Sequence, residues 1–352
     1  MLHKHQNKHG ACQLNITSKM NIPAKLYQLT DRLYDSITIK RKCSVSLPED
    51  KFDEKQFSID AFYNTVQPFF NQPELFYTTL NAPAENSIKK IHVENNETLF
   101  AYPSPATTNW KENNTAFFKL FSNDKANKTL LLFAPGWARK NLDMESKLCR
   151  QLLNNGIDTC LLIKPFHQQR TPAGLYSGEL FISPHIFLTV MNFRQFVAEI
   201  RFLIQHFKKQ YDYVGIIGMS SGGFQAGLAI DVEPVDFYFP IITAAKLGTI
   251  TWQSIFTKYI KRELIQKGID EDQLNKAWAI TDQYYLGHNC KAKYIKQFIS
   301  LYDEAVATKY QYLLNDIYHN PDVVEMKCAH CSVFFYFDKI VKEISKTVHE
   351  RI

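Results

Sequence analysis

The sequence predicts an α/β protein whose central sheet is mostly parallel and flanked by helices. Two observations support this fold class. Short apolar segments alternate with longer amphipathic segments from about residue 129 onward, which is the rhythm of repeated strand–helix units. The short segments are apolar at every position and not at alternate positions, as is typical of parallel strands that are buried on both faces.

The composition fits a globular protein and gives little sign of a polyanionic partner. Hydrophobic residues make up 45% of the 352 residues and charged residues 22%, which is ordinary for a folded domain. The 41 basic and 35 acidic residues leave a net charge of +6. This excess is mild, and no zinc-finger, RNA-binding or helix-turn-helix pattern accompanies it, so we expect no nucleic acid among the partners.

Cysteine usage and hydropathy predict a cytoplasmic protein. The seven cysteines are odd in number and scattered, which fits a reducing compartment better than a disulfide framework. The start, MLHKHQNKHGACQLN, lacks the apolar stretch of a secretory signal, and no segment has the roughly 18 apolar residues that span a bilayer. We expect a soluble protein, with at most peripheral membrane contact through its basic N-terminus, although a solvated arm is the simpler interpretation.

The N-terminal part differs from the rest of the chain. Residues 1–20 are polar and rich in His and Lys, which predicts a flexible basic tail. Residues 21–86 have a helical pattern with apolar side chains on one face, so we predict a helical extension packed through that face on the domain at 87–352. The residues of the face are Leu26, Leu29, Leu33 and Tyr34, followed by Phe57, Ala61, Phe62 and Val66.

The elements of the domain follow a change of period near Ser87. Three β-type segments separated by Asn-rich turns come first: SIKKIHV with the nearby TLFAY, then TAFFKLF, then TLLLFAP. Apolar strands then alternate with helices. The strands are DTCLLIKPF, YVGIIG and VDFYFPII, and the helices are MESKLCRQLLNNG, FRQFVAEIRFLIQHFKK and the segment that begins SGGFQAGLAI.

A helical insertion interrupts this rhythm at about 246–290. The segments WQSIFTKYIKRELIQKG and EDQLNKAWAITDQYY are predicted as its helices, and they fall where such a sheet can hold a small cap. The rhythm resumes with the strands YIKQFISLYD and VVEMKC and ends with the helix FFYFDKIVKEISKTV.

The pattern G-x-S-x-G stands at Gly218-Met219-Ser220-Ser221-Gly222, between a buried strand and a helix rich in Gly and Ala. A nucleophile on a sharp strand-to-helix turn needs small residues two positions before and after it, and glycine occupies both positions. The helix N-terminus also favours negative charge that develops beside Ser220. The alternatives are a glycine-rich packing turn and a phosphate-binding turn, but the latter requires Lys-Ser/Thr or further glycines, which are absent.

A serine nucleophile needs a general base and an orienting carboxylate, and on such a turn the chain order is Ser, Asp/Glu, His. Asp303 ends one predicted strand and His330 follows the last one, which places both at the edge where parallel sheets hold their chemistry. The alternatives are a helix N-cap for Asp303 and an ordinary loop histidine for His330. Their joint order with Ser220 favours a catalytic triad.

Cys328 and Cys331 flank His330 as C-x-x-C. A structural zinc site needs four ligands, and no second pair stands at a suitable spacing. A redox pair is expected in a thioredoxin-like context, which is absent. We therefore expect no metal site, and we interpret both cysteines as small residues around the histidine loop.

The oxyanion hole is expected from two backbone N–H groups. One belongs to Ser221, which follows the nucleophile. The other comes from the loop PGWA at 135–138, where Pro135 has no N–H and the donor is therefore Trp137 or a neighbour.

From about Ser87 to the C-terminus the sequence resembles the α/β-hydrolases. It is similar to a subfamily that has an F-x-P-S-P-like segment, here YPSP at 102–105, and P-x-H-x-x-R-x-P after the fourth strand, here at 165–172 and followed by SGE at 177–179. The resemblance implies the α/β-hydrolase fold and hydrolysis of an ester, thioester or amide without a cofactor. The chain departs from the usual pattern with Pro-Gly in place of His-Gly in the oxyanion loop, and no glycine precedes His330.

His167 and Arg170 belong to that segment and follow a strand end. We name both as candidate pocket residues, because Arg170 there can hold a substrate carboxylate or phosphate. A loop-stabilising role, in which Arg170 donates to backbone carbonyls, has at least equal weight.

The leading hypothesis is a serine hydrolase that cleaves an ester or thioester through an acyl-enzyme intermediate. The aromatic and aliphatic residues of the insertion favour a small-molecule or lipid-like acyl substrate. The alternatives are a non-catalytic binding or scaffold protein on the same fold, which normally shows erosion of the triad, and an acyltransferase that uses the same triad.

Overall fold

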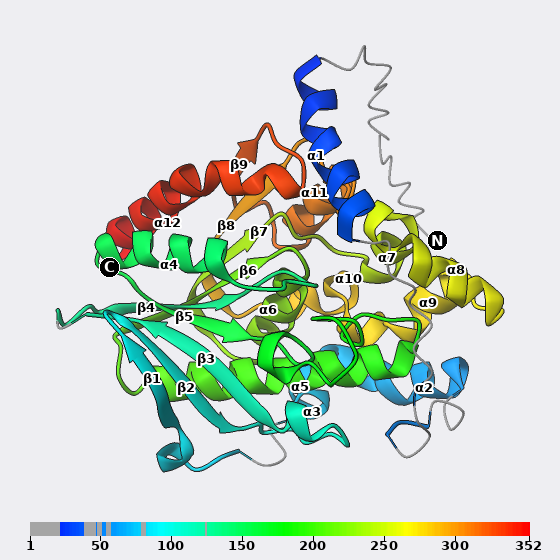
Figure 1. Cartoon of the computed structure of the whole chain (residues 1–352), viewed down its shortest axis with the longest axis horizontal. Helices are drawn as coiled ribbons and strands as arrows, with labels where there is room; N and C mark the ends of the chain where they lie inside the picture. Colours follow the sequence, from blue (N-terminus) through cyan, green and yellow to red (C-terminus); the bar gives the residue numbers. More distant parts are fainter. Residues whose placement is uncertain (1–21, 39–46, 48–50, 54–57, 79–81, 124) are drawn as a thin grey trace, which may run out of the picture.

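The computed structural model describes residues 22–38, 47, 51–53, 58–78, 82–123 and 125–352. Their centre is a nine-stranded sheet in the order β1-β2-β3-β5-β4-β6-β7-β8-β9 (Figure 1). The first three strands, β1 (Lys89–Glu94), β2 (Glu97–Pro103) and β3 (Thr115–Phe121), pair antiparallel, and β3 continues antiparallel onto β5.

The other six strands are parallel and form the buried part of the sheet. They are β4 (Thr129–Ala134), β5 (Asp158–Ile163), β6 (Tyr213–Met219), β7 (Val235–Ile241), β8 (Ala292–Ser300) and β9 (Asp322–Met326). Every residue of β4 and β5 is buried, as their uninterrupted apolar sequences predict. Because parallel strands end at one common edge, the loops that follow β4, β5, β6, β8 and β9 meet there.

Two layers of helices cover the sheet (Figure 1). On one face α4 (Asp143–Asn154) packs beside α12 (Phe337–Arg351), and on the other α5 (Ile186–Phe207) packs beside α6 (Ser221–Val232). The connection from β8 to β9 contains α11 (Thr308–Ile317). Helix α5 begins seven positions before the predicted Phe193, because most of the residues in between are also buried.

The first helix, α1 (Ile22–Thr38), corrects one prediction. Of the predicted apolar face, Tyr34 packs on Phe256, but Leu26, Leu29 and Leu33 are 66%, 47% and 50% exposed. The helix packs through a different face, at the centre of which Asp31 is fully buried. The leucine pattern therefore identified the helix correctly and its buried side wrongly.

Two further helices, α2 (Ile59–Val66) and α3 (Pro73–Phe76), complete the described part of the N-terminal region. Phe62 packs against the core and Val66 is buried in it, as the predicted face requires, whereas Ala61 is exposed. Phe57 and the predicted tail at 1–20 lie outside the described residues.

The segment between β7 and β8 contains four α-helices, of which the first three lie to the right of the sheet in Figure 1 and the fourth contacts α6. They are α7 (Leu247–Gln253), α8 (Lys258–Gln266), α9 (Glu271–Ala277) and α10 (Gln283–Leu286). The segment predicted as one helix from Trp252 is interrupted at Ser254, whose hydroxyl accepts a hydrogen bond from the Phe256 N–H. None of the described helices is both long and apolar enough to cross a membrane.

Candidate active site

Ser220 lies on the turn between β6 and α6, with φ +53° and ψ −125°. This backbone conformation is costly for a residue with a side chain and persists only where the surroundings enforce it. The flanking glycines let the backbone of the turn pack closely against β4 and the start of α6. A Cβ on Gly222 would lie 2.1 Å from the Ala134 oxygen, and a Cβ on Gly218 would lie 2.6 Å from the Gly223 Cα.

The structure brings the three predicted catalytic side chains together at this turn. The Ser220 Oγ lies 2.8 Å from the His330 Nε2, and the His330 Nδ1 lies 2.8 Å from the Asp303 Oδ2. An ionised carboxylate only accepts hydrogen bonds. The His330 Nδ1–H therefore donates to Asp303, which leaves Nε2 to accept from the Ser220 hydroxyl.

Asp303 is also held by its own loop. Its second oxygen, Oδ1, accepts hydrogen bonds from the Ala305 and Val306 N–H groups at 2.9 and 2.7 Å. The alternative role of a helix N-cap does not apply to Asp303, because α11 begins at Thr308 and its N-cap is Ala307, but Asp303 does cap the turn that precedes this helix. The two roles are compatible, because the capping bonds orient the oxygen that faces His330.

Burial and charge act on His330 in opposite directions. Burial opposes the charged imidazolium, whereas the carboxylate of Asp303 favours it, and Asp31 adds a further favourable charge, with Arg139 acting the other way. The net result is a pKa of His330 above its ordinary value. A histidine of this kind is suited to take a proton from a hydroxyl, because the site stabilises the cation that results.

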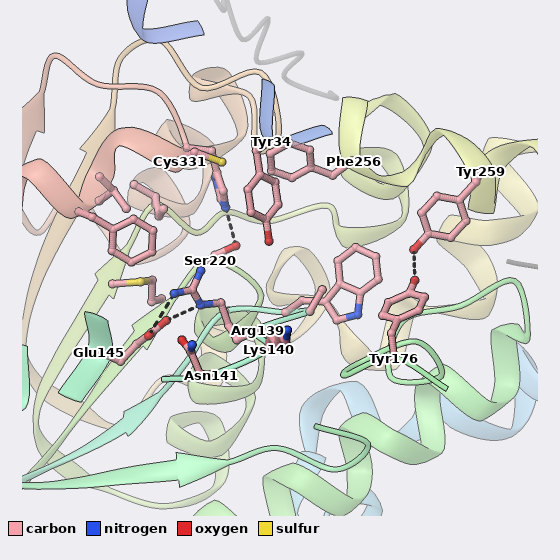
Figure 2. A pocket seen from close by; sticks show the side chains of 18 residues that line it. Tyr34, Arg139, Lys140, Asn141, Glu145, Tyr176, Ser220, Phe256, Tyr259 and Cys331 are labelled. Carbon is pink, nitrogen blue, oxygen red and sulfur yellow. Dashed lines mark hydrogen bonds and ion pairs between the residues drawn. The ribbon is translucent and has the colours of Figure 1, made fainter. Parts of the chain in front are cut away.

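Ser220 and His330 open onto a cavity of about 500 Å³ (Figure 2). Most of the lining is aromatic or aliphatic, namely Tyr34, Trp137, Tyr176, Phe256, Tyr259 and Phe334, with Met219, Ile242 and Val333. The charged and amide side chains of this lining, besides His330, are Arg139, Lys140, Asn141 and Glu145, which lie below Ser220 in Figure 2. The cavity thus joins a reactive serine to a mainly apolar wall.

Arg139 is a cavity residue that the sequence did not single out. Its Nε lies 2.8 Å from the Oε1 of the fully buried Glu145, and its guanidinium stacks over the Phe334 ring at 4.9 Å. Burial raises the pKa of Glu145, and Arg139 offsets part of that increase. The only signal in the sequence was position, since Arg139 directly follows the predicted oxyanion loop.

The predicted oxyanion loop lies next to the nucleophile. A Cβ on Gly136 would lie 3.7 Å from the Ser220 Cβ. The Ala138 N–H donates to the His167 Nε2 at 3.1 Å, and the Trp137 indole N–H donates to the Gly178 oxygen at 2.7 Å. These bonds fix the loop, and the backbone N–H groups of Trp137 and Ser221 stay the predicted oxyanion donors.

His167 and Arg170 do not line the cavity, which corrects their assignment as candidate pocket residues. Both are buried. Arg170 donates to both carboxylate oxygens of Glu199 at 2.7 and 2.8 Å, and to the carbonyls of Ile163 and Asn113. The loop-stabilising alternative therefore fits the geometry, because the fully buried guanidinium donates to two backbone carbonyls and to the buried Glu199.

Two cysteines flank His330 in the sequence, and they form no disulfide bond. Cys328 and Cys331 are both free cysteines, and Cys328 is buried. Within the described ranges, no group of three or more His, Cys, Asp or Glu side chains is arranged to hold a metal ion.

A mostly parallel sheet with a serine on the turn after β6 defines an α/β-hydrolase, and comparison with protein families agrees. Residues 111–334 match the family described as alpha/beta hydrolase domain containing 18. The match spans well over half of the chain, and the chain belongs to this family. The predicted fold and superfamily are thereby confirmed.

Solved structures with the same fold include several esterases. An acetyl xylan esterase from Paenibacillus sp. R4 is 12% identical, with 82% of this chain and 99% of that chain covered and a TM-score of 0.60. Acetyl xylan esterase 1 from Thermoanaerobacterium sp. JW/SL YS485 is 13% identical, with 82% and 93% covered and a TM-score of 0.58.

A third similar structure is an acylaminoacyl peptidase from Pyrococcus horikoshii, 13% identical, with 75% of this chain and 40% of that chain covered and a TM-score of 0.52. At these identities the likeness shows the fold alone. No curated protein matches the chain.

Proposed function

We propose that this protein is a serine hydrolase of the carboxylic ester hydrolase type. The observation that carries the proposal is the continuous hydrogen-bonded row from the Ser220 Oγ through His330 to Asp303, which ends at the cavity. A serine hydroxyl is a weak nucleophile unless a base removes its proton, and this row supplies that base together with its orienting carboxylate.

The reaction has two halves. In the first, the Ser220 Oγ attacks the acyl carbonyl carbon while its proton moves to the His330 Nε2. The tetrahedral intermediate collapses when His330 returns that proton to the leaving alkoxide or thiolate, and an acyl-enzyme remains. In the second half, His330 takes a proton from water, the resulting hydroxide attacks the acyl carbon, and Ser220 leaves with the proton restored.

The wall of the cavity supports an ester or thioester with an apolar acyl group, of which lipid-like esters are one class. Trp137, Phe256 and Phe334 offer apolar surface within the same cavity as Ser220, and burying acyl methylenes against such surface contributes about 0.8 kcal/mol for each one. Two proteins that share the fold are named for acetyl ester cleavage.

The two alternatives predict other behaviour. A non-catalytic scaffold is not expected to hold Ser220, His330 and Asp303 at hydrogen-bonding distance next to a cavity. An acyltransferase uses the same first half-reaction and differs only in the acceptor, so added alcohols or thiols in the assay would divert the acyl group from water into a new ester or thioester.

The test is hydrolysis of p-nitrophenyl esters with short, medium and long acyl chains. We expect the wild type and a Ser58→Ala variant to release p-nitrophenol at similar rates, because Ser58 is exposed and precedes α2. The Ser220→Ala variant should release none above background. Equal activity of Ser220→Ala and wild type would contradict the proposal.

A further inference from the structure

Helix α1 lies against both loops that hold the acid and the base of the site. The Tyr27 ring stacks on Tyr302 with 6.1 Å between centroids. The Arg32 guanidinium donates two hydrogen bonds to Glu304 at 3.0 and 2.8 Å. Residues 302 and 304 flank Asp303, so α1 contacts the chain on both sides of the predicted catalytic carboxylate.

The same helix reaches the cavity at its C-terminal half. Tyr34 lines the cavity near Ser220 and packs on Phe256 with 5.4 Å between ring centroids (Figure 2). Phe256 in turn meets the His330 ring edge-on at 5.7 Å. Helix α1 is thus part of the wall around the reacting groups.

The central contact of α1 is the carboxylate of Asp31, which is fully buried. Its Oδ2 accepts a hydrogen bond from the backbone N–H of His330 at 3.0 Å, and its Oδ1 accepts one from the N–H of Cys331 at 2.7 Å. These residues begin the 3-10 helix Cys331–Tyr336. The first N–H groups of a helix have no partner within it, so Asp31 supplies the missing acceptors from 299 positions away.

We propose that Asp31 is a positioning residue of the active site, which fixes the backbone of His330 and places a second negative charge beside its imidazole. The inference rests on the proposed function, because it assigns Asp31 to the hydrolysis that Ser220 and His330 perform. It gives the N-terminal helix a role in catalysis and not only in packing.

The charge of Asp31 has a consequence that simple packing does not have. The charged and titratable groups that face His330 are Asp303, Asp31, Arg139 and Cys331, and Tyr34 lies beside Arg139. Among them, Asp303 and Asp31 both favour the imidazolium and raise the pKa of His330. Removing the charge of Asp31 therefore lowers that pKa.

The sign of the pH effect follows from the protonation state that the reaction needs. His330 must be neutral to take the Ser220 proton, so activity falls as the pH falls through the pKa of His330. A lower pKa moves this acid limb of kcat/KM to lower pH. Weaker packing of α1 that leaves the Asp31 carboxylate beside His330 would reduce activity without moving the limb in that direction.

The experiment compares Asp31→Asn with Asp31→Glu and with two controls in the full chain, using the p-nitrophenyl ester that the wild type cleaves best. Asp212→Asn makes the same chemical change at an exposed position before β6, at the opposite edge of the sheet. Arg32→Ala removes the exposed anchor to Glu304 and leaves the groups around His330 in place.

For Asp31→Asn we expect kcat to fall about tenfold or more, because one of the two partly buried N–H groups loses its acceptor. KM should change little, and the acid limb should move to lower pH. Asp31→Glu keeps the charge and displaces the oxygens, so it should lower kcat with the limb unmoved. Both control variants should keep the wild-type limb, and Asp212→Asn should also keep the wild-type kcat.

The outcomes separate this inference from the proposed function. A wild type without esterase activity, or an active Ser220→Ala, overturns the proposed function. An active wild type with the same kcat and acid limb in Asp31→Asn overturns the role of Asp31, as does an Arg32→Ala variant that reproduces both changes. If Asp31→Asn does not fold, a folded Asp31→Glu with wild-type kcat overturns the role equally.

Discussion

Two loops at the same edge of the sheet each present a histidine, the buried His167 and the partly exposed His330, and only His330 faces the cavity. After β5, His167 accepts a hydrogen bond from the Ala138 N–H and lies near the Pro165 carbonyl. After β9, His330 contacts Ser220 and Asp303. The role of a histidine at this edge of the sheet therefore depends on its hydrogen-bond partners and not on its position in the fold alone.

Each loop also contains one member of an ion pair, and only one of these two pairs is in contact with the cavity. Arg170 and Glu199 form a pair that is enclosed by protein on all sides. In the His330–Asp303 pair the carboxylate is buried, but the imidazole is partly exposed and lines the cavity. The first pair should therefore act on stability and the second on activity, and substitutions can separate these two effects.

The largest effect is expected from Asp303→Asn. An amide in place of the carboxylate cannot both accept from the His330 Nδ1–H and stabilise the imidazolium, so kcat/KM should fall by about 10³- to 10⁴-fold. Steady-state hydrolysis of a p-nitrophenyl ester measures it, with the exposed Asp322→Asn as the matched control. A loss of less than tenfold in a folded protein would remove Asp303 from the triad.

Arg170→Met should lower the free energy of unfolding by an amount comparable to the loss of transition-state stabilisation in Asp303→Asn. The substitution leaves the Glu199 carboxylate buried without its partner, which costs about 3–5 kcal/mol of unfolding free energy. Chemical denaturation measures the loss, and Arg262→Met on the exposed face of α8 serves as the control.

The molecules of Arg170→Met that remain folded should react with a serine-directed probe at the wild-type rate. A variant of full stability that has lost activity would return Arg170 to the substrate pocket. Adding Glu199→Met to Arg170→Met should recover part of the stability, because no unpaired buried charge then remains.

Arg139→Met should lower the free energy of unfolding by about 1–2 kcal/mol near neutral pH. This loss is smaller than that of Arg170→Met, because the pair of Arg139 with Glu145 is partly open to the cavity. Burial already raises the folded-state pKa of Glu145, and loss of Arg139 raises it further. A raised carboxyl pKa costs nothing below the unfolded-state pKa and destabilises as the pH rises through the folded-state value. Denaturation across a pH series should show a deficit that grows with pH, whereas a constant deficit would contradict this explanation.

Lys164→Met should change activity only slightly. Lys164 is fully buried, its Nζ donates to the Ser221 Oγ at 2.7 Å, and burial lowers its pKa well below the ordinary value. It does not line the cavity, so we expect kcat/KM within about threefold of wild type, since one hydrogen bond contributes about 1 kcal/mol.

The stability of Lys164→Met gives a second readout. Because burial lowers the pKa of Lys164 in the folded wild type, the unfolded chain binds a proton there at pH values where the folded chain does not. The free energy of unfolding therefore rises with pH up to the unfolded-state pKa of the lysine, in the alkaline range. The methionine variant should lose this part of the rise. An unchanged slope in denaturation experiments would mean that Lys164 is charged in the folded protein.

The sequence predicts best where one segment determines its own environment. The parallel strands follow from their uninterrupted apolar residues, and the turn at Ser220 follows from glycines that nothing larger can replace. Asp303 and His330 were identified because the order of strand ends is fixed along the chain. The strands and the turn are specified by local signals, whereas Asp303 and His330 were found from their order along the chain relative to Ser220.

Prediction failed where burial depends on a distant partner. The leucines of α1 are exposed because the face with Asp31 gains hydrogen bonds from His330 and Cys331. No pattern within 21–86 shows those donors. Arg170 likewise lacks a visible partner in its own segment, since Glu199 lies on α5.

The most direct test of the account is the site at which a fluorophosphonate probe attaches. The wild type should form one covalent adduct, and peptide mapping by mass spectrometry should place it on Ser220. Asp303→Asn should label far more slowly, Arg170→Met at the wild-type rate for each folded molecule, and Ser220→Ala not at all. Labelling that persists in Ser220→Ala, or an adduct mapped to another residue, would contradict the assignment of Ser220 as the nucleophile.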